Sequence, residues 1–370
     1  MTTQAQSIKA LPEHVLRLHE LDDVWRAPSA GERLERVRSL APRFRERVLA
    51  SGRAVAVRTF DVTALPYPTA FAFAGAALSP VPYIVMTNRV NVVQFEDEDR
   101  KLRTLLFNPT DVPRSARTPF FADLRARMGE SISTRVMDLL KKPTPAERLA
   151  SIGLSPEDVD YIAFDHMHTQ DVRALLGTAP AKDGEGLRAI FPKAKLLIWR
   201  PELDIFRALH PLQRPWYIAE GVRHVPADRF LVCDGDVLLG KGVALVRTPG
   251  HTVGNWSLVV NTDNGIWAVS ENGVAADAYA PEASKIPGLR KHARREGAEV
   301  VLNANTLEGR NEQYTSMVLE KSIVDRCRDN PDFCQHFSSS ELTATPFTPG
   351  LSPTYRHGGI ESGEIRRVNV

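Results

Sequence analysis

Apolar residues recur three or four positions apart near the start of the chain. Between residues 34 and 48 they are Leu34, Val37, Leu40, Phe44 and Val48. This spacing places one apolar stripe along a helix, so we predict a helical segment over residues 1 to about 50, kinked or split at Pro42. The stripe favours packing against the main domain or a second copy of the chain, rather than a lid over a site.

From residue 53 the apolar period shortens, and strands become the favoured element. Four segments rich in Val, Phe and Tyr are separated by turns that contain Pro or Asn; they span residues 53–60, 83–87, 90–95 and 102–107. Later strands are predicted at residues 161–164, 196–199, 230–233, 244–247, 257–261, 266–269 and 299–302. Helices are predicted at residues 123–142, from Thr144-Pro145, at 201–209 and at 313–328. Strands mixed with helices indicate an α/β or α+β domain.

The loop after the predicted strand at residues 161–164 carries two histidines. His166 and His168 are two residues apart, so in an extended loop both imidazoles can point the same way. Two imidazoles that converge on one point can begin a site for zinc, iron or manganese. A surface loop that happens to contain histidines is the alternative that this pattern alone leaves open.

Composition and charge exclude several classes of partner. The 370 residues are 43% hydrophobic and 25% charged, as in an ordinary globular protein, with a formal net charge of +2. A balance so near neutral gives no reason to expect nucleic acid or an acidic membrane as a partner. No apolar run approaches the roughly 20 residues that cross a bilayer, and residues 1–10 lack the pattern of a signal peptide.

The cysteine count indicates a reducing compartment. Three cysteines, Cys233, Cys327 and Cys334, are too few for a disulfide framework, so we expect a cytoplasmic protein. Cys327, Cys334 and His336 lie near one another in sequence, but their spacing is no standard zinc pattern.

A second loop strengthens the metal interpretation. A predicted strand ends at Arg247, and residues 248–254 (TPGHTVG) then form a turn that delivers His251. Together the two loops resemble the metallo-β-lactamase superfamily of hydrolases. There, a His-x-His-x-Asp-His loop and a Thr-Pro-Gly-His-Thr-x-Gly turn supply metal ligands. The second motif matches in full, and the first matches at His166 and His168.

The resemblance implies an αββα sandwich, two packed mixed sheets with helices on the outer faces, over about residues 53–310. We therefore expect a helical extension at residues 1–52 and a metallo-β-lactamase-like domain at residues 53–337. The tail at residues 338–370 is expected to pack on that domain or to be partly extended. The helical extension makes a homodimer possible.

The chain departs from the family pattern where a second metal would bind. Gln170 and Asp171 occupy the positions of the family's Asp and His, and Glu271 stands where a bridging aspartate is usual. No histidine follows the predicted strand at residues 299–302. The family's three-histidine set is retained as His166, His168 and His251. Three nitrogens plus water is the open arrangement of a catalytic zinc site, so we expect one zinc, with iron or manganese as alternatives.

Three further residues are candidates for catalysis. Asp171 is a candidate general base or metal ligand, and a helix cap is its alternative role. Glu271 is placed to bind the metal or to orient a histidine. Asn272, together with Asn303, is a candidate donor to a developing oxyanion, and turn formation is the alternative for both.

The favoured function is a metal-dependent hydrolase. A zinc-activated water would attack a small, largely apolar electrophile such as a lactone, ester, amide or activated aryl halide. An iron or manganese redox enzyme on the same fold is one alternative, and metal content would separate the two. A non-catalytic metal- or ligand-binding protein is the other, because fold alone does not assign function.

Overall fold

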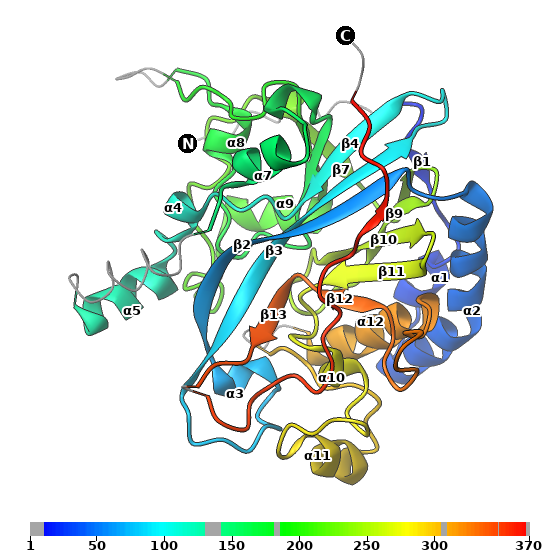
Figure 1. Cartoon of the computed structure of the whole chain (residues 1–370), viewed down its shortest axis with the longest axis vertical. Helices are drawn as coiled ribbons and strands as arrows, with labels where there is room; N and C mark the ends of the chain where they lie inside the picture. Colours follow the sequence, from blue (N-terminus) through cyan, green and yellow to red (C-terminus); the bar gives the residue numbers. More distant parts are fainter. Residues whose placement is uncertain (1–10, 130–141, 181–185, 305–308, 347, 368–370) are drawn as a thin grey trace.

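Two β-sheets lie face to face at the centre of the computed structural model, which describes residues 11–129, 142–180, 186–304, 309–346 and 348–367 (Figure 1). The first sheet has the strand order β1 (Leu16–Arg17), β8 (Val237–Gly240), β9 (Val243–Arg247), β10 (Trp256–Thr262), β11 (Gly265–Ser270) and β12 (His336–Ser338). The second has the order β14 (Ser362–Gly363), β2 (Ala56–Pro68), β3 (Tyr83–Glu96), β4 (Leu102–Phe107), β5 (Tyr161–Ala163), β6 (Lys195–Trp199) and β7 (Phe230–Cys233). Strand β13 (Ser340–Thr343) pairs with β3.

Alternation along the strands produces the layers. In β4, Leu105 and Phe107 point between the sheets, whereas Leu106 points to the outer face of the second sheet. In β10, Leu258 points between the sheets, whereas Val259 points to the outer face of the first sheet. Period-two alternation of this kind buries both faces of each sheet, so helices must cover the outside.

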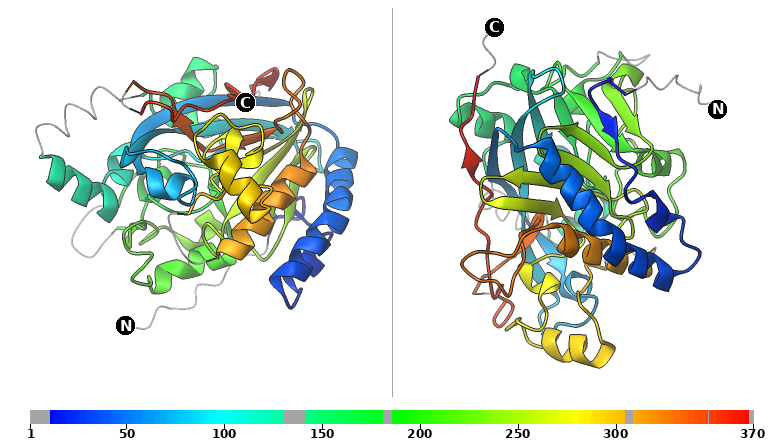
Figure 2. Two further views of the ribbon diagram at one scale, coloured as in Figure 1. Left: turned by 90° about the horizontal axis from the view of Figure 1, so that it is seen from below. Right: turned by 90° about the vertical axis from the view of Figure 1, so that its right-hand side faces the viewer.

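Helices occupy both outer faces. They are α1 (Asp22–Trp25), α2 (Ala30–Ser51), α3 (Thr69–Ala72), α4 (Val112–Ser115), α5 (Pro119–Met128), α7 (Pro145–Ser151), α8 (Arg173–Leu176), α9 (Arg200–Asp204), α10 (Ala276–Tyr279), α11 (Leu289–Glu296) and α12 (Arg310–Ile323). Helices α2 and α12 lie side by side outside the first sheet (Figure 2). The αββα arrangement that the resemblance implied is confirmed.

Helix α2 buries the predicted stripe. Val37, Phe44 and Val48 are fully buried against α12 and the outer face of the first sheet. Ser29 caps the first turn through a bond from the backbone N–H of Glu32. Pro42 lies inside one continuous helix, so the helix is not split there, and the kink stays a prediction.

Some predicted elements differ from the structure. Residues 83–96 form one long strand instead of two, and residues 299–302 form no strand, although Val301 donates its N–H to the carbonyl of Ala278. The predicted helix at 123–142 is observed as far as Met128, and residues 130–141 lie outside the described residues. Within the described ranges, no helix is both long and apolar enough to cross a membrane.

Candidate metal centre

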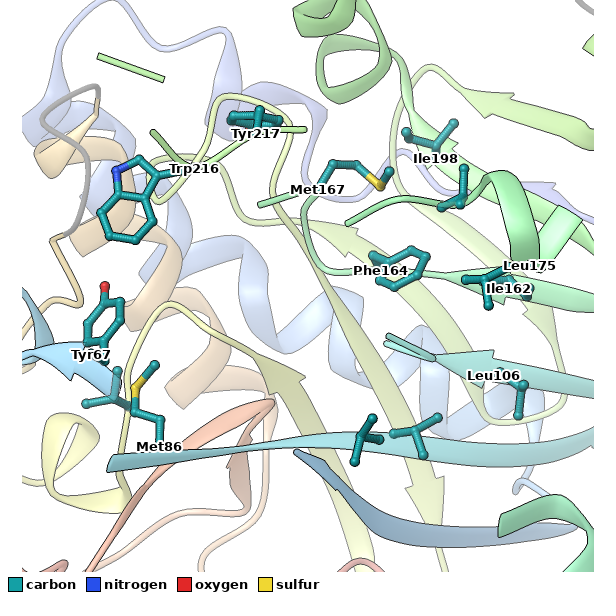
Figure 3. Packing of buried hydrophobic residues seen from close by; sticks show 14 of the residues in the cluster. Tyr67, Met86, Leu106, Ile162, Phe164, Met167, Leu175, Ile198, Trp216 and Tyr217 are labelled. Carbon is teal, nitrogen blue, oxygen red and sulfur yellow. The ribbon is translucent and has the colours of Figure 1, made fainter. Parts of the chain in front are cut away.

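The first histidine loop follows the central strand of a parallel run. Strands β4, β5 and β6 pair in parallel, so the chain leaves β5 at an edge where ligand sites commonly form. His166 and His168 are 4% and 5% exposed. Met167, between them, points the other way into the apolar cluster with Phe164 and Ile198 (Figure 3). One buried apolar side chain therefore fixes the direction of both imidazoles.

The second loop brings His251 to the same point. The ring centroid of His251 lies 4.5 Å from that of His166 and 5.2 Å from that of His168. One candidate ligand atom from each of the three residues lies within 4.8 Å of the other two. Three buried imidazoles at this separation match the donor set of a divalent transition metal, so these histidines are the residues that would hold it.

Two glycines in the turn at residues 248–254 allow the backbone to pack closely. A Cβ on Gly250, whose φ is +131°, would lie 2.1 Å from the backbone N of Gln313. A Cβ on Gly254 would lie 2.3 Å from the backbone N of Glu202. Both positions therefore require glycine, which explains why the motif contains it.

A hydrogen bond and an ion-pair contact orient two of the three rings. The Nδ1 atom of His251 lies 3.2 Å from the backbone carbonyl of Asn303. A carbonyl can only accept, so Nδ1 carries the proton and Nε2 carries the lone pair of the neutral ring. The Nδ1 atom of His166 lies 3.0 Å from the carboxylate of Asp165, which also accepts a bond from the hydroxyl of Ser339.

Burial and charge set the protonation of the three rings. Burial lowers the pKa of His251 to about 3, assisted by the charge of His166, and it lowers the pKa of His168 well below its usual value. Burial also opposes a proton on His166, but the Asp165 carboxylate outweighs it and raises the pKa of His166 to about 9. A metal and a proton therefore compete at His166, because a histidine must be neutral to bind a metal.

Glu202, at the start of α9, joins the two loops. Its carboxylate accepts bonds from the backbone N–H of Met167 at 2.7 Å and from the hydroxyl of Thr252 at 2.7 Å. It also accepts a bond from the hydroxyl of Tyr217, whose ring lies 4.8 Å from that of His168. Sequence analysis missed this residue, because a glutamate after Arg200-Pro201 carries no pattern that distinguishes it from a helix-start glutamate.

Asp171 is not part of the group of three histidines. Its carboxylate receives two bonds from the guanidinium of Arg173, at 2.9 and 2.6 Å, and lies 3.6 Å from that of Arg114. It also accepts the backbone N–H of Arg173, the first residue of α8, at 3.1 Å, although Val172 is the N-cap residue of that helix. The carboxylate is already engaged by the guanidinium groups of Arg173 and Arg114, so this geometry does not favour the general-base role.

Glu271 and Asn272 have different surroundings. Glu271 borders the cavity, and its carboxylate lies 3.9 Å from Nε2 of His251. Burial raises the pKa of Glu271 to about 7. The amide N–H groups of Asn272 donate instead to Glu320, at 2.9 Å, and to the carbonyl of Thr248. An oxyanion donor would have to face the cavity, so this geometry does not favour that role for Asn272.

Asn303 occupies the place where the family would have its last histidine. It orients His251 through its backbone carbonyl, and its side-chain oxygen accepts a bond from Tyr67.

The cysteine-containing segment holds no comparable group among the described residues: Cys327 lies 3.7 Å from Nδ1 of His357, and His336 stacks on Tyr279.

A small cavity of about 40 Å³ opens beside the histidines. Its apolar wall consists of Leu65, Tyr67, Met86, Phe121 and Trp216. The ring centroids of Tyr67 and Trp216 lie 6.2 Å apart (Figure 3). Its polar wall includes Asn88, Asn108, Thr110 and Ser340. The cavity therefore offers a small group apolar contacts on one wall and polar contacts on the other.

Comparisons with known proteins identify sequence relatives over part of the chain. No protein-family model matches the chain. The N-acyl homoserine lactonase AiiA of Bacillus thuringiensis is 29% identical over 129 residues, which are 34% of this chain and 44% of that protein. The match thus spans less than half the length of this curated relative. The chain has two paired sheets, outer helices and both histidine loops. The chain has the metallo-β-lactamase fold.

Two solved structures are similar to it. The dizinc quorum-quenching lactonase AidC aligns with a TM-score of 0.46 and 13% identity, over 84% of this chain and 95% of that one. The hydrolase AbOPH of the beta lactamase superfamily aligns with a TM-score of 0.38 and 15% identity, over 66% of this chain and 85% of that one.

Proposed function

We propose that this metallo-β-lactamase-fold chain is a metal-dependent hydrolase that opens lactones or cleaves related small esters. The observation that carries the proposal is the convergence of His166, His168 and His251, with ligand atoms within 4.8 Å of one another, beside a cavity that has one apolar wall. The 129-residue similarity to N-acyl homoserine lactonases supports a lactone over an amide or an aryl halide.

One metal, zinc in our proposal, would be held by the three histidines. When bound, it would lower the pKa of water toward ~7 and polarise the carbonyl under attack. Contacts on the far side of the rings hold the ligands in place. Asp165 contacts Nδ1 of His166, and the carbonyl of Asn303 contacts Nδ1 of His251. Glu202 joins the two histidine loops. Such supporting contacts restrict ring rotation and so preserve the ligand set.

Glu271 is the carboxylate that we assign to proton transfer. It borders the cavity beside His251, whereas Asp171 is held by arginines. A carboxylate that borders the cavity and lies 3.9 Å from Nε2 of His251 is placed to accept and return a proton during hydrolysis. Tyr67 and Trp216 would contact the apolar part of the substrate, leaving its carbonyl directed toward the histidines.

A substrate panel tests this proposal. Protein purified without added metal is assayed with N-acyl homoserine lactones, chromogenic esters and halogenated aromatics, before and after dialysis against a chelator. We expect release of acid from lactones, lost on chelation and restored by zinc, and no such release by His168→Ala. Chelator-insensitive turnover, or none on any member of the panel with zinc bound, would contradict it. Oxygen consumption with bound iron or manganese would favour the redox alternative.

A further inference from the structure

Helix α12 places several polar side chains in the interior, and three of them share one face. Gln313, Ser316 and Glu320 are spaced i, i+3 and i+7, so they share one face of the helix, and they are 1%, 0% and 0% exposed. A buried helix face is normally apolar, because a buried polar group costs free energy unless it is hydrogen-bonded. We call these three residues the polar face of α12 and ask what each contacts.

Gln313 bonds to the two loops that flank the histidines. Its side-chain N–H groups donate to the carbonyl of Asn303 at 2.5 Å and to that of Asn272 at 3.1 Å. The carbonyl of Asn303 is the one that holds Nδ1 of His251. Gln313 therefore fixes the acceptor that selects the tautomer and the direction of His251.

Ser316 holds the turn that carries His251. Its hydroxyl donates to the carbonyl of Pro249 at 2.7 Å, two residues before the histidine. The next residue, Gly250, packs so closely on the backbone of Gln313 that no side chain fits between them. The turn is thus fixed on α12 by one hydrogen bond and one backbone contact.

Glu320 holds the loop that follows β11. Its carboxylate accepts bonds from the side chains of Ser257, Ser270, Asn272 and Tyr279, at 2.5, 2.6, 2.9 and 2.7 Å. It also lies 3.6 Å from the imidazole of His336. Asn272 directly follows Glu271, so Glu320 fixes the backbone from which Glu271 reaches the cavity. These donors satisfy a carboxylate that would otherwise be costly to bury.

We infer that α12 is a positioning element of the metal centre. Gln313 and Ser316 set the orientation of His251, and Glu320 sets the position of the loop that carries Glu271. The inference rests on the proposed function, since it concerns the same three histidines. Gln313, Ser316 and Glu320 are therefore positioning residues. None of the three is among the residues that line the cavity, and each acts through the loop that carries His251 or Glu271.

Two serines on α12 provide a matched test. Ser316→Ala removes the hydroxyl that reaches Pro249, whereas Ser322→Ala removes one that bonds only within the helix, to the carbonyl of Val318. Gln313→Met is a second test variant that keeps side-chain length and removes both donated bonds. For each protein we would measure the Kd for Zn²⁺ by competition with a chromogenic chelator, the visible spectrum of the Co²⁺ form and the melting temperature without metal.

Ser316→Ala and Gln313→Met should weaken Zn²⁺ binding by about 10–100-fold and alter the Co²⁺ spectrum, as loss of a residue that supports a ligand does. Ser322→Ala should change neither. If the parent protein binds Zn²⁺ and both test variants bind it equally well, with only the melting temperature lowered, α12 is merely structural and the inference is overturned. If the parent protein does not bind Zn²⁺, the proposed function fails, and the inference fails with it.

Discussion

The metal site depends on His251, because it alone supplies the third nitrogen, whereas His166 and His168 lie on one shared loop. His251→Ala should therefore lose most of its bound metal and nearly all activity, since two histidines from one loop rarely hold zinc alone. Metal per chain after gel filtration measures this. His210→Ala, which changes an exposed histidine, is the control and should retain both. A His251→Ala variant with full metal would place the site elsewhere.

Substitution of Asp171 distinguishes a structural role, through its arginine contacts, from a role in proton transfer. Asp171→Asn should keep its metal and a kcat within a few-fold of the parent value, because Arg173 and Arg114 hold the carboxylate. Loss of charge-assisted hydrogen bonds should lower the free energy of unfolding by about 1–3 kcal/mol. Chemical denaturation and metal analysis check both statements. A fall of kcat by about 10²-fold or more with metal retained would restore the general-base interpretation.

Among single residues, the three candidate metal ligands could be predicted from the sequence, but the roles of the residues that orient them could not. His166, His168 and His251 carry a spacing and a turn motif that can be recognised from residue types alone. Asn303 acts through its backbone carbonyl, which every residue has, so no sequence pattern identifies it. Glu202 bonds to both histidine loops only because α9 is folded against them. Contacts made by tertiary packing have no local signature.

Among elements, α2 and α12 act as a pair. Arg33 bonds to Glu312 at the start of α12, and Arg45 bonds to the carbonyl of Ile323 at its end. The amphipathic period of α2 was sufficient to predict this helix, whereas the polar face of α12 was not predictable, because polar residues at helical spacing normally indicate a solvent-exposed face.

The strand predicted at residues 299–302 is absent from the structure. A short apolar run fits a buried strand, a buried helix or a buried extended segment equally well, so the sequence alone does not decide between them.

Phe44 measures how much α2 contributes to stability. It is fully buried between α2 and the outer face of the first sheet. Phe44→Ala should lower the free energy of unfolding by about 3–5 kcal/mol, the usual cost of removing a buried aromatic ring. Leu49→Ala, on the same helix but 42% exposed, should cost about 0.5 kcal/mol or less. Equal effects in denaturant unfolding would mean that α2 packs only loosely.

For the molecule as a whole, a charged cluster joins the N-terminal segment to the first sheet. Asp22 accepts bonds from Arg17 and Arg247, both at 2.6 Å, and Arg247 also bonds to the fully buried Asp236. Burial alone would raise the pKa of Asp22, but bonds from His19, Arg17 and Arg247 outweigh it and hold that pKa well below its usual value.

This cluster predicts a stability change at acid pH. A carboxyl with a depressed folded pKa stabilises the fold above its unfolded pKa of about 3.9, and that contribution is lost as pH falls through the folded value. Asp22→Asn should therefore be less stable than the parent protein at pH 7, by about 2 kcal/mol. The difference should shrink as pH falls below about 4. A difference that stays constant from pH 7 to pH 3 in urea unfolding would contradict this.

If three histidines hold one metal that supports hydrolysis, a titration with Zn²⁺ should show it. Metal-free protein receives Zn²⁺ in small steps, and the rate of lactone hydrolysis is measured at each step. We predict a rate that rises in proportion to added Zn²⁺ and reaches its plateau at one equivalent per chain, because only three histidines gather as ligands among the described residues. A plateau at two equivalents, or a rate that does not respond to Zn²⁺, would contradict the account.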